Sequence, residues 1–103
     1  MINLEDQINQ FISEYNVKNH QHSKVKIENF FKKYPNEIKL LQIIGIFFAQ
    51  NKKFKDAIII FKRILEKDLQ SIEVLINIGL AYYELNKLDE ALEYLQQLRQ
   101  PSR

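Results

Sequence analysis

The stretch Ile43–Ala57, IIGIFFAQNKKFKDA, places a glycine inside a run of large apolar residues and then turns abruptly basic. The chain has only two glycines, Gly45 and Gly79, and they lie 34 residues apart. Ala57 and Ala91 keep the same distance. Bulky residues repeat with this spacing too, in the pairs Leu41 and Leu75, Ile44 and Ile78, Phe48 and Tyr82, and Phe61 and Leu95. The sequence is therefore built on an internal repeat.

The rest of the sequence predicts helix almost throughout. Two prolines and two glycines in 103 residues leave few helix breakers, and apolar residues recur at helical spacing in six segments. Short polar stretches such as 51–53 and 86–87 separate these segments, and their asparagines tolerate the left-handed conformation that ends a helix. Connections of this length join antiparallel neighbours. We expect an all-α fold without strands.

The glycines have a physical role in such a fold. A glycine inside a helix costs about 1 kcal/mol relative to alanine, so a close approach of another helix must offset that cost. We expect Gly45 and Gly79 to face the second helix of their own hairpin, with Ala57 and Ala91 completing the contact. One hairpin cannot bury its large side chains alone, so hairpins must stack side by side.

The repeat resembles the tetratricopeptide repeat, a helix-turn-helix unit with small residues at two fixed positions. The resemblance divides the chain into units at about 5–37, 38–71 and 72–103, and NIGLAYYELNKLDEALEYL in the last unit is the closest match. In the first unit Ile12 replaces the glycine and Ser23 replaces the alanine. The resemblance implies a single domain over residues 1–103, an α-solenoid of about six helices in which antiparallel pairs form a right-handed superhelix.

The resemblance also implies a function, because arrays of this family are binding scaffolds. The first helices of successive units line a concave groove that receives a peptide or a helix from a protein partner. Carried over by position, the groove residues are Lys39, Gln42, Ile43, Ile46, Ala49 and Gln50 in the second unit, and Glu73, Ile76, Asn77, Leu80, Tyr83 and Glu84 in the third. The first unit would add Asp6, Asn9, Gln10, Ser13 and Asn16.

These positions also help to separate kinds of partner. Family members that grip the carboxylate end of a chaperone use cationic and amide side chains there, but this chain has Glu73 and Asn77. The apolar residues among these positions would form a floor that suits an amphipathic helix better. In the alternative interpretation, the same residues pack against neighbouring helices of the array or of a longer parent chain.

A second function class stays open. Such arrays often precede transferase domains, so the resemblance also allows a region appended to a catalytic domain and serving substrate recruitment or oligomerisation. The sequence stops at QLRQPSR without the polar capping helix that an array usually needs. Leu92, Leu95 and Leu98 would then be partly uncovered, which predicts either a longer parent protein or self-association.

Composition excludes several other classes. Lys and Arg total 15 against 13 Asp and Glu, without a basic run longer than two residues, so no stripe for nucleic acid is present. Aromatic and basic residues interleave at FFKKY and KKFK, but those aromatics have core spacing. The N-terminus is acidic at Glu5 and Asp6, unlike a secretory signal, and no apolar run approaches the roughly 20 residues that span a bilayer. With no cysteine, the chain suits a reducing, cytoplasmic location.

Residues with catalytic or metal-binding chemistry are few. His20 and His22 have a spacing that can bind metal, but they lie in the polar segment NHQHSK, for which we predict a solvated loop. Asp89 and Glu90, like Glu66 and Asp68, read as solvated helix charges. The serines lack a nucleophile context, and no glycine-rich phosphate loop exists. We therefore predict neither enzymatic activity nor a cofactor.

Overall fold

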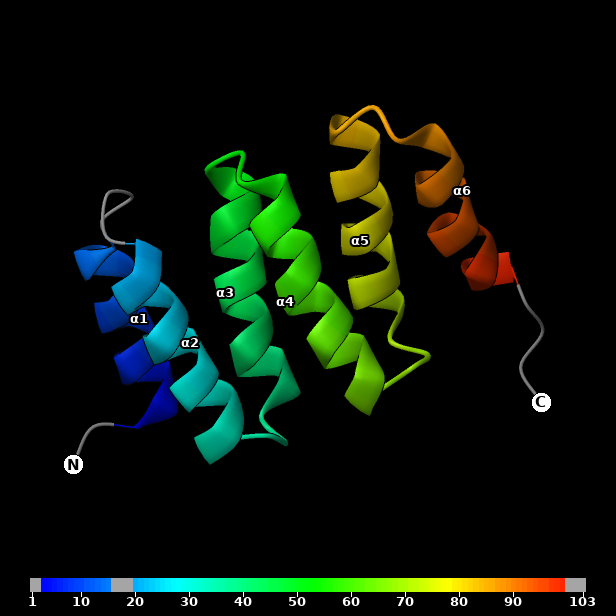
Figure 1. The fold of residues 1–103 in the computed structure, drawn as a ribbon. Helices are drawn as coiled ribbons and strands as arrows, with labels where there is room; N and C mark the ends of the chain where they lie inside the picture. The colour runs from blue at the N-terminus through cyan, green and yellow to red at the C-terminus, as the bar shows by residue number, and fades with distance from the viewer. Residues whose placement is uncertain (1–2, 16–19, 100–103) are drawn as a thin grey trace.

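The computed structural model describes residues 3–15 and 20–99, and its regular secondary structure there is entirely helical. The elements are α1 (Leu4–Glu14), α2 (His20–Lys33), α3 (Ile38–Gln50), α4 (Phe54–Lys67), α5 (Ile72–Glu84), α6 (Leu88–Gln96) and a final 3-10 turn, η2 (Gln97–Arg99). The helices follow one another along an elongated body of 43 × 31 × 16 Å (Figure 1). The predicted all-α fold is confirmed.

The helices pack mainly with their neighbours in the chain. α3 contacts α4, α4 contacts α5 and α5 contacts α6, while α1 reaches past α2 to contact α3. The first helices of the hairpins, α1, α3 and α5, thus form one row, and α2 and α4 lie in front of α1 and α3 in Figure 1. The largest side chains that are almost fully buried are Phe61, Ile8, Leu41, Ile44, Ile64, Ile78 and Val74.

The two glycines each face a large side chain from the second helix of their own hairpin. A Cβ added to Gly45 would come within 2.5 Å of Phe61 Cε1 on α4, and one added to Gly79 would come within 2.6 Å of Leu95 Cδ2 on α6. Ala57 and Ala91, on those same two helices, are buried. The expected hairpin contacts are confirmed, and the 34-residue period corresponds to one α-hairpin.

The ends of α3 and α5 have the same backbone geometry, 34 residues apart. Lys52 and Asn86 both have a φ of 61°, in the left-handed region. After each, the next residue closes the helix: the Lys53 N–H donates to the Phe48 carbonyl at 2.8 Å and the Lys87 N–H to the Tyr82 carbonyl at 2.9 Å. An asparagine was expected in this conformation in both turns, but Asn51 has a φ of −95° and lysine takes the strained position instead.

Replacing Lys52 with glycine is therefore expected to stabilise the protein by about 0.5–1 kcal/mol. A left-handed conformation costs a residue with a Cβ roughly 1 kcal/mol or more, and glycine avoids that cost. Urea unfolding measures the change as a rise in the transition midpoint. The matched control is Lys55→Gly in the first turn of α4, which should lose about 1 kcal/mol. A lower midpoint for Lys52→Gly would contradict the assigned turn geometry.

The segment NHQHSK differs from its prediction. We expected a solvated loop there, but α2 begins at His20, and His22 is an exposed residue in its first turn. The helix forms because its later residues Ile27 and Phe31 are buried against neighbouring helices. Packing of an amphipathic helix supplies most of its stability, so a polar first turn is tolerated.

Aromatic rings connect the α1–α2 hairpin internally and join its Tyr15 to α3. Tyr15, which follows α1, makes edge contacts with Phe47 and Phe48, with ring centroids 5.1 and 5.5 Å apart. Phe11 meets Phe30 of α2 in the same manner at 6.0 Å. Burial raises the pKa of the Tyr15 phenol, and the Asp56 carboxylate adds to the rise. The joint therefore depends on aromatic packing, which is stronger than area alone suggests.

Candidate functional site

A depression of about 220 Å³ lies between α3 and α5, close to the turns that end both helices. Its floor and walls combine apolar side chains with a few polar groups that can orient a ligand, as ligand sites usually do. Six of its lining residues are groove positions carried over from the family resemblance: Ile46, Ala49, Gln50, Asn77, Leu80 and Glu84. The structure thus brings half of the assigned positions on these two helices to one place.

The other assigned residues on α3 and α5 lie outside this depression. Gln42 is buried rather than open to solvent, and its side-chain amide donates a 3.2 Å hydrogen bond to Glu73 Oε2 on α5. Ile43 is partly buried against the core. Ile76 is partly buried and Lys39 is exposed. This hydrogen bond links α3 to α5.

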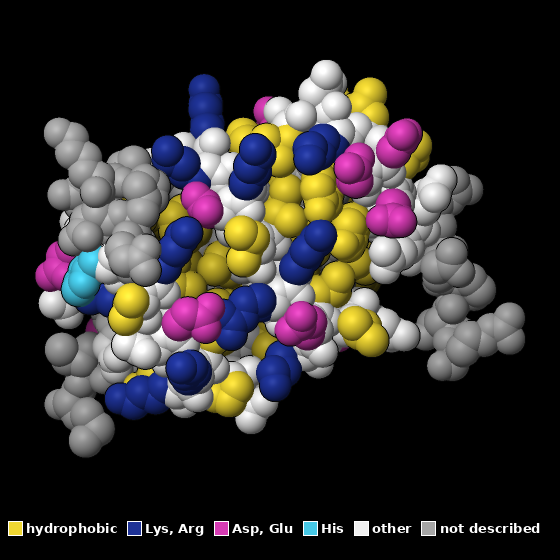
Figure 2. All heavy atoms as spheres, viewed as in Figure 1, with side chains coloured by type: hydrophobic (Ala, Val, Ile, Leu, Met, Phe, Trp, Pro, Cys, Tyr) yellow, Lys and Arg dark blue, Asp and Glu magenta, His cyan; other side chains and the backbone are white. Residues whose placement is uncertain are grey.

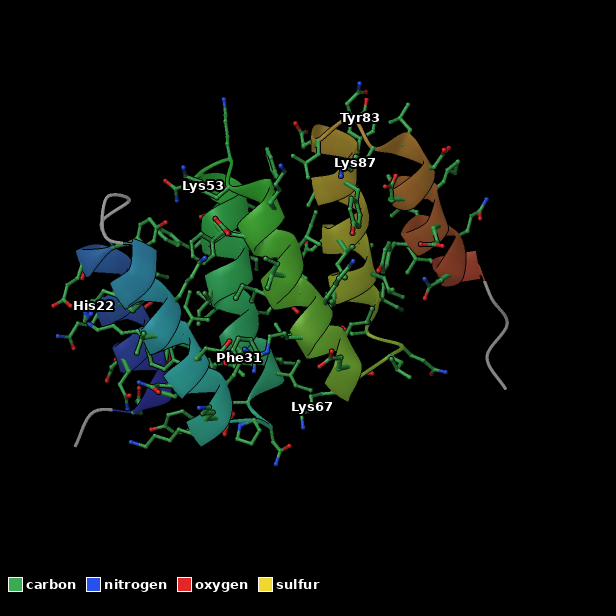
Figure 3. All side chains as sticks on the ribbon, viewed as in Figure 1. His22, Phe31, Lys53, Lys67, Tyr83 and Lys87 are labelled. Atoms are coloured by element: carbon green, nitrogen blue, oxygen red, sulfur yellow. The ribbon has the colours of Figure 1, made fainter. Side chains whose placement is uncertain are left out.

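Tyr83 lies at the end of α5, beside the turn that leads to α6 and near Lys87 (Figure 3). It is 60% exposed, and Leu80, one helical turn earlier on α5, is 52% exposed. Leu80 lines the depression, and Tyr83 is exposed outside it at the end of α5.

On α1 the assigned residues are polar. Asp6, Asn9, Gln10 and Ser13 are all exposed. Ser13 donates its hydroxyl hydrogen to the Gln10 carbonyl at 2.9 Å, and the Gln10 amide donates to Glu14 Oε2 at 3.2 Å. Asn16 lies outside the described residues. This end of the row can offer hydrogen bonds but little apolar surface.

Charge along the row of first helices is mostly negative. α1, α3 and α5 carry the carboxylates Glu5, Asp6, Glu14, Glu73 and Glu84 against the single cation Lys39. Some of these carboxylates have partners within the protein: Glu14 pairs with Lys26 at 3.6 Å, and Glu73 accepts the Gln42 bond. Glu84 lines the depression itself. Carboxylates therefore outnumber cations on these three helices.

Sequence reasoning missed three residues of the depression, Phe54, Phe61 and Ala81. Phe54 and Phe61 come from α4 and reach between the two first helices, where Phe61 also fills the space left by Gly45. Periodicity assigns each residue to the interior of its own hairpin, so it gives no signal that α4 contributes to the floor. The glycine contact with Phe61 was the one available hint.

Other kinds of site find little support within residues 3–15 and 20–99. No group of three or more His, Cys, Asp or Glu residues there could hold a metal ion. No helix in that part of the chain is long and apolar enough to cross a membrane.

The exposed leucines of α6 are a second surface feature: Leu88 and Leu92 are half exposed, and Leu98 of η2 is exposed to a lesser degree.

Comparison with known protein families gives a match over the second half of the chain. A family model described as tetratricopeptide repeat matches residues 48–102, from the end of α3 onward. No curated protein matches the chain. Repeats of this kind generally mediate protein–protein interaction and are typically non-catalytic. The matched stretch covers more than half of the sequence and contains the α5–α6 hairpin with both of its small residues, Gly79 and Ala91. The chain therefore belongs to the tetratricopeptide repeat family.

Proposed function

We propose that the protein is an interaction scaffold that binds a partner segment in the groove between α3 and α5. The observation that carries the proposal is the depression there, in which six groove positions assigned from the sequence converge on an apolar floor. Ile46, Leu80 and Tyr83 supply the apolar contact, while Gln50 and Asn77 can hydrogen-bond to the ligand backbone. The partner is a protein segment with an apolar face, either an amphipathic helix or an extended peptide.

The charge of the groove narrows the partner further. Carboxylates outnumber cations on α1, α3 and α5, and Glu84 lies at the depression. Complementary charge speeds association and sets orientation more than it adds affinity. We therefore infer that Lys or Arg residues flank the apolar face of the partner, and that binding weakens as salt rises. The carboxylate terminus of a chaperone is negatively charged, like the groove, and therefore does not suit it.

The experiment that tests the proposal compares proteins captured by the wild-type chain with those captured after Ile46 and Leu80 are both changed to glutamate. A partner held in the groove is lost from the second set. The alternative function, substrate recruitment for an attached catalytic domain, assigns the same groove to a substrate protein. A substrate held in this way would be lost as well.

The leucines of α6 favour self-association as an additional property. Leu88 and Leu92 are 52% and 53% exposed and lie one helical turn apart on the same face. Covering an apolar face of this kind with a second molecule lowers the free energy, because apolar surface is removed from water. We propose that two copies of the chain associate through it at high concentration.

Sedimentation velocity tests this association. The weight-average sedimentation coefficient of the wild-type chain is expected to rise with concentration, and Leu92→Lys should suppress the rise because it places a charge in the centre of the contact. Leu69→Lys is the matched control, since Leu69 is also exposed but lies in the α4–α5 connection. A wild-type chain that stays monomeric at the highest concentration would refute the contact.

A further inference from the structure

A second cavity among the described residues has no role in the proposed function. It has a volume of about 270 Å³ and lies between α2 and α4, with Phe48 of α3 and Tyr15 contributing to it. It shares no lining residue with the depression between α3 and α5. Its apolar residues Ile27, Phe48 and Ile60 are buried, while Ile59 at its edge is 58% exposed.

The internal repeat shows what fills the equivalent space in the next pair of helices. Phe48 and Ile60 lie 34 residues before Tyr82 and Tyr94. Tyr94 of α6 stacks on Tyr82 of α5, with ring centroids 5.7 Å apart and planes inclined by 22°. Lys62 of α4 lies over both rings, with Nζ 5.4 and 5.8 Å from their centroids. Figure 2 shows hydrophobic side chains gathered between α4 and α6 on this face of the molecule.

Between α2 and α4, the same repeat positions carry different side chains. Isoleucine at position 60 replaces the ring of Tyr94, so Phe48 has no aromatic side chain from α4 stacked on it. Glu28 takes the place of Lys62, and its carboxylate pairs with Arg63 across the α2–α4 gap. Arg63 in turn lies 4.2 Å from the ring centroid of Phe31, which Figure 3 shows between α2 and α4. The ring missing from α4 leaves the cavity open.

We propose that this cavity binds a tyrosine side chain presented by a partner protein. Size permits it, because an apolar cavity of about 150 Å³ already takes up benzene. The partner ring would lie in the cavity beside Phe48 and Ile60, which line it. The Asp56 carboxylate at the cavity edge can accept the phenol hydrogen, which favours tyrosine over phenylalanine. Ile59 extends the apolar surface beyond one ring, as a protein partner requires.

The tyrosine side-chain analogue p-cresol is the probe for this site. In a chain labelled at its isoleucine methyl groups, p-cresol is expected to shift the methyl NMR resonances of Ile27, Ile59 and Ile60 in a saturable manner. Toluene, which lacks the hydroxyl, should bind several-fold more weakly. N-acetyltyrosinamide, which carries the backbone of a tyrosine residue, should shift the same methyl groups. Absence of saturable shifts at these three residues would overturn the proposal. Binding of p-cresol without N-acetyltyrosinamide would overturn it too, because the cavity would then take only free phenols.

Two variants link the shifts to the cavity. Ile60→Tyr restores the ring found in the next repeat, so it should fill the cavity and abolish the shifts at Ile27 and Ile59. Ile59→Lys changes only the exposed edge, keeps the core intact and should weaken p-cresol binding several-fold. Leu69→Tyr adds the same ring at an exposed position in the α4–α5 connection and should leave binding of p-cresol unchanged. Shifts that survive both Ile60→Tyr and Ile59→Lys would overturn the site.

Discussion

Replacing Gly45 with leucine is expected to abolish cooperative unfolding of the α3–α4 hairpin and to lower the stability of the protein by more than about 4 kcal/mol. Even a methyl group at this position would meet Phe61 Cε1 at 2.5 Å. The Phe61 ring is only 1% exposed, so moving it away would disturb the core around it. Leucine favours helix over glycine, so helix propensity cannot cause the loss. Thermal unfolding followed by circular dichroism measures it.

The equivalent change in the second hairpin is expected to be milder. Gly79 faces Leu95, whose side chain is flexible and only partly buried. Gly79→Leu should therefore unfold the end of the array, α5 and α6, while α3 and α4 keep their structure. Gln50→Leu, on the exposed side of α3, is the control and should be close to neutral.

A double-mutant cycle identifies the contact itself. Gly45→Ala and Phe61→Ala should each destabilise the protein, but together they should cost clearly less than the sum of the two changes, because Phe61→Ala removes the ring that the new methyl group meets. Additive losses, or an unchanged melting temperature for Gly45→Leu, would show that Gly45 does not face Phe61.

The hairpins were predictable because their signal is local and doubled. Gly45 with Ala57 and Gly79 with Ala91 mark a close contact that helical packing needs, and the contacts at Phe61 and Leu95 confirm it. The start of α2 was not predictable, since the polar residues from His20 onward gain their helical structure from the later burial of Ile27. Local propensity is a weak guide where tertiary packing decides.

The candidate site was predictable only in part, for a similar reason. Sequence spacing places Ile46, Asn77 and Leu80 on the first helices, and these residues do line one depression. Spacing cannot show that Gln42 turns inward to bind Glu73, because that hydrogen bond depends on the distance between α3 and α5. The cavity between α2 and α4 depends in the same way on side-chain volumes at positions 60 and 94, which gain meaning only when the two joints are compared.

Changing Ile46 and Leu80 together to glutamate is expected to reduce partner affinity by roughly 100-fold or more, since losing an apolar contact there and burying an unpaired carboxylate each cost about 1–3 kcal/mol. Leu80 is half exposed and Ile46 partly so, and the fold should therefore survive. Affinity capture with mass spectrometry identifies the partner, and calorimetric titration of that partner measures the loss. Circular dichroism confirms that the helices remain.

The matched control is the pair Val25→Glu and Leu69→Glu, which adds the same two charges to exposed apolar positions away from the groove. It should bind the partner as the wild type does. The neutral pair Ile46→Ser and Leu80→Ser separates apolar contact from charge, because a partner held by the floor loses affinity in both groove variants. If a partner binds the glutamate variant more tightly than the wild type, it recognises only the negative charge of α1, α3 and α5. Undiminished binding by both groove variants would place the site elsewhere on the array.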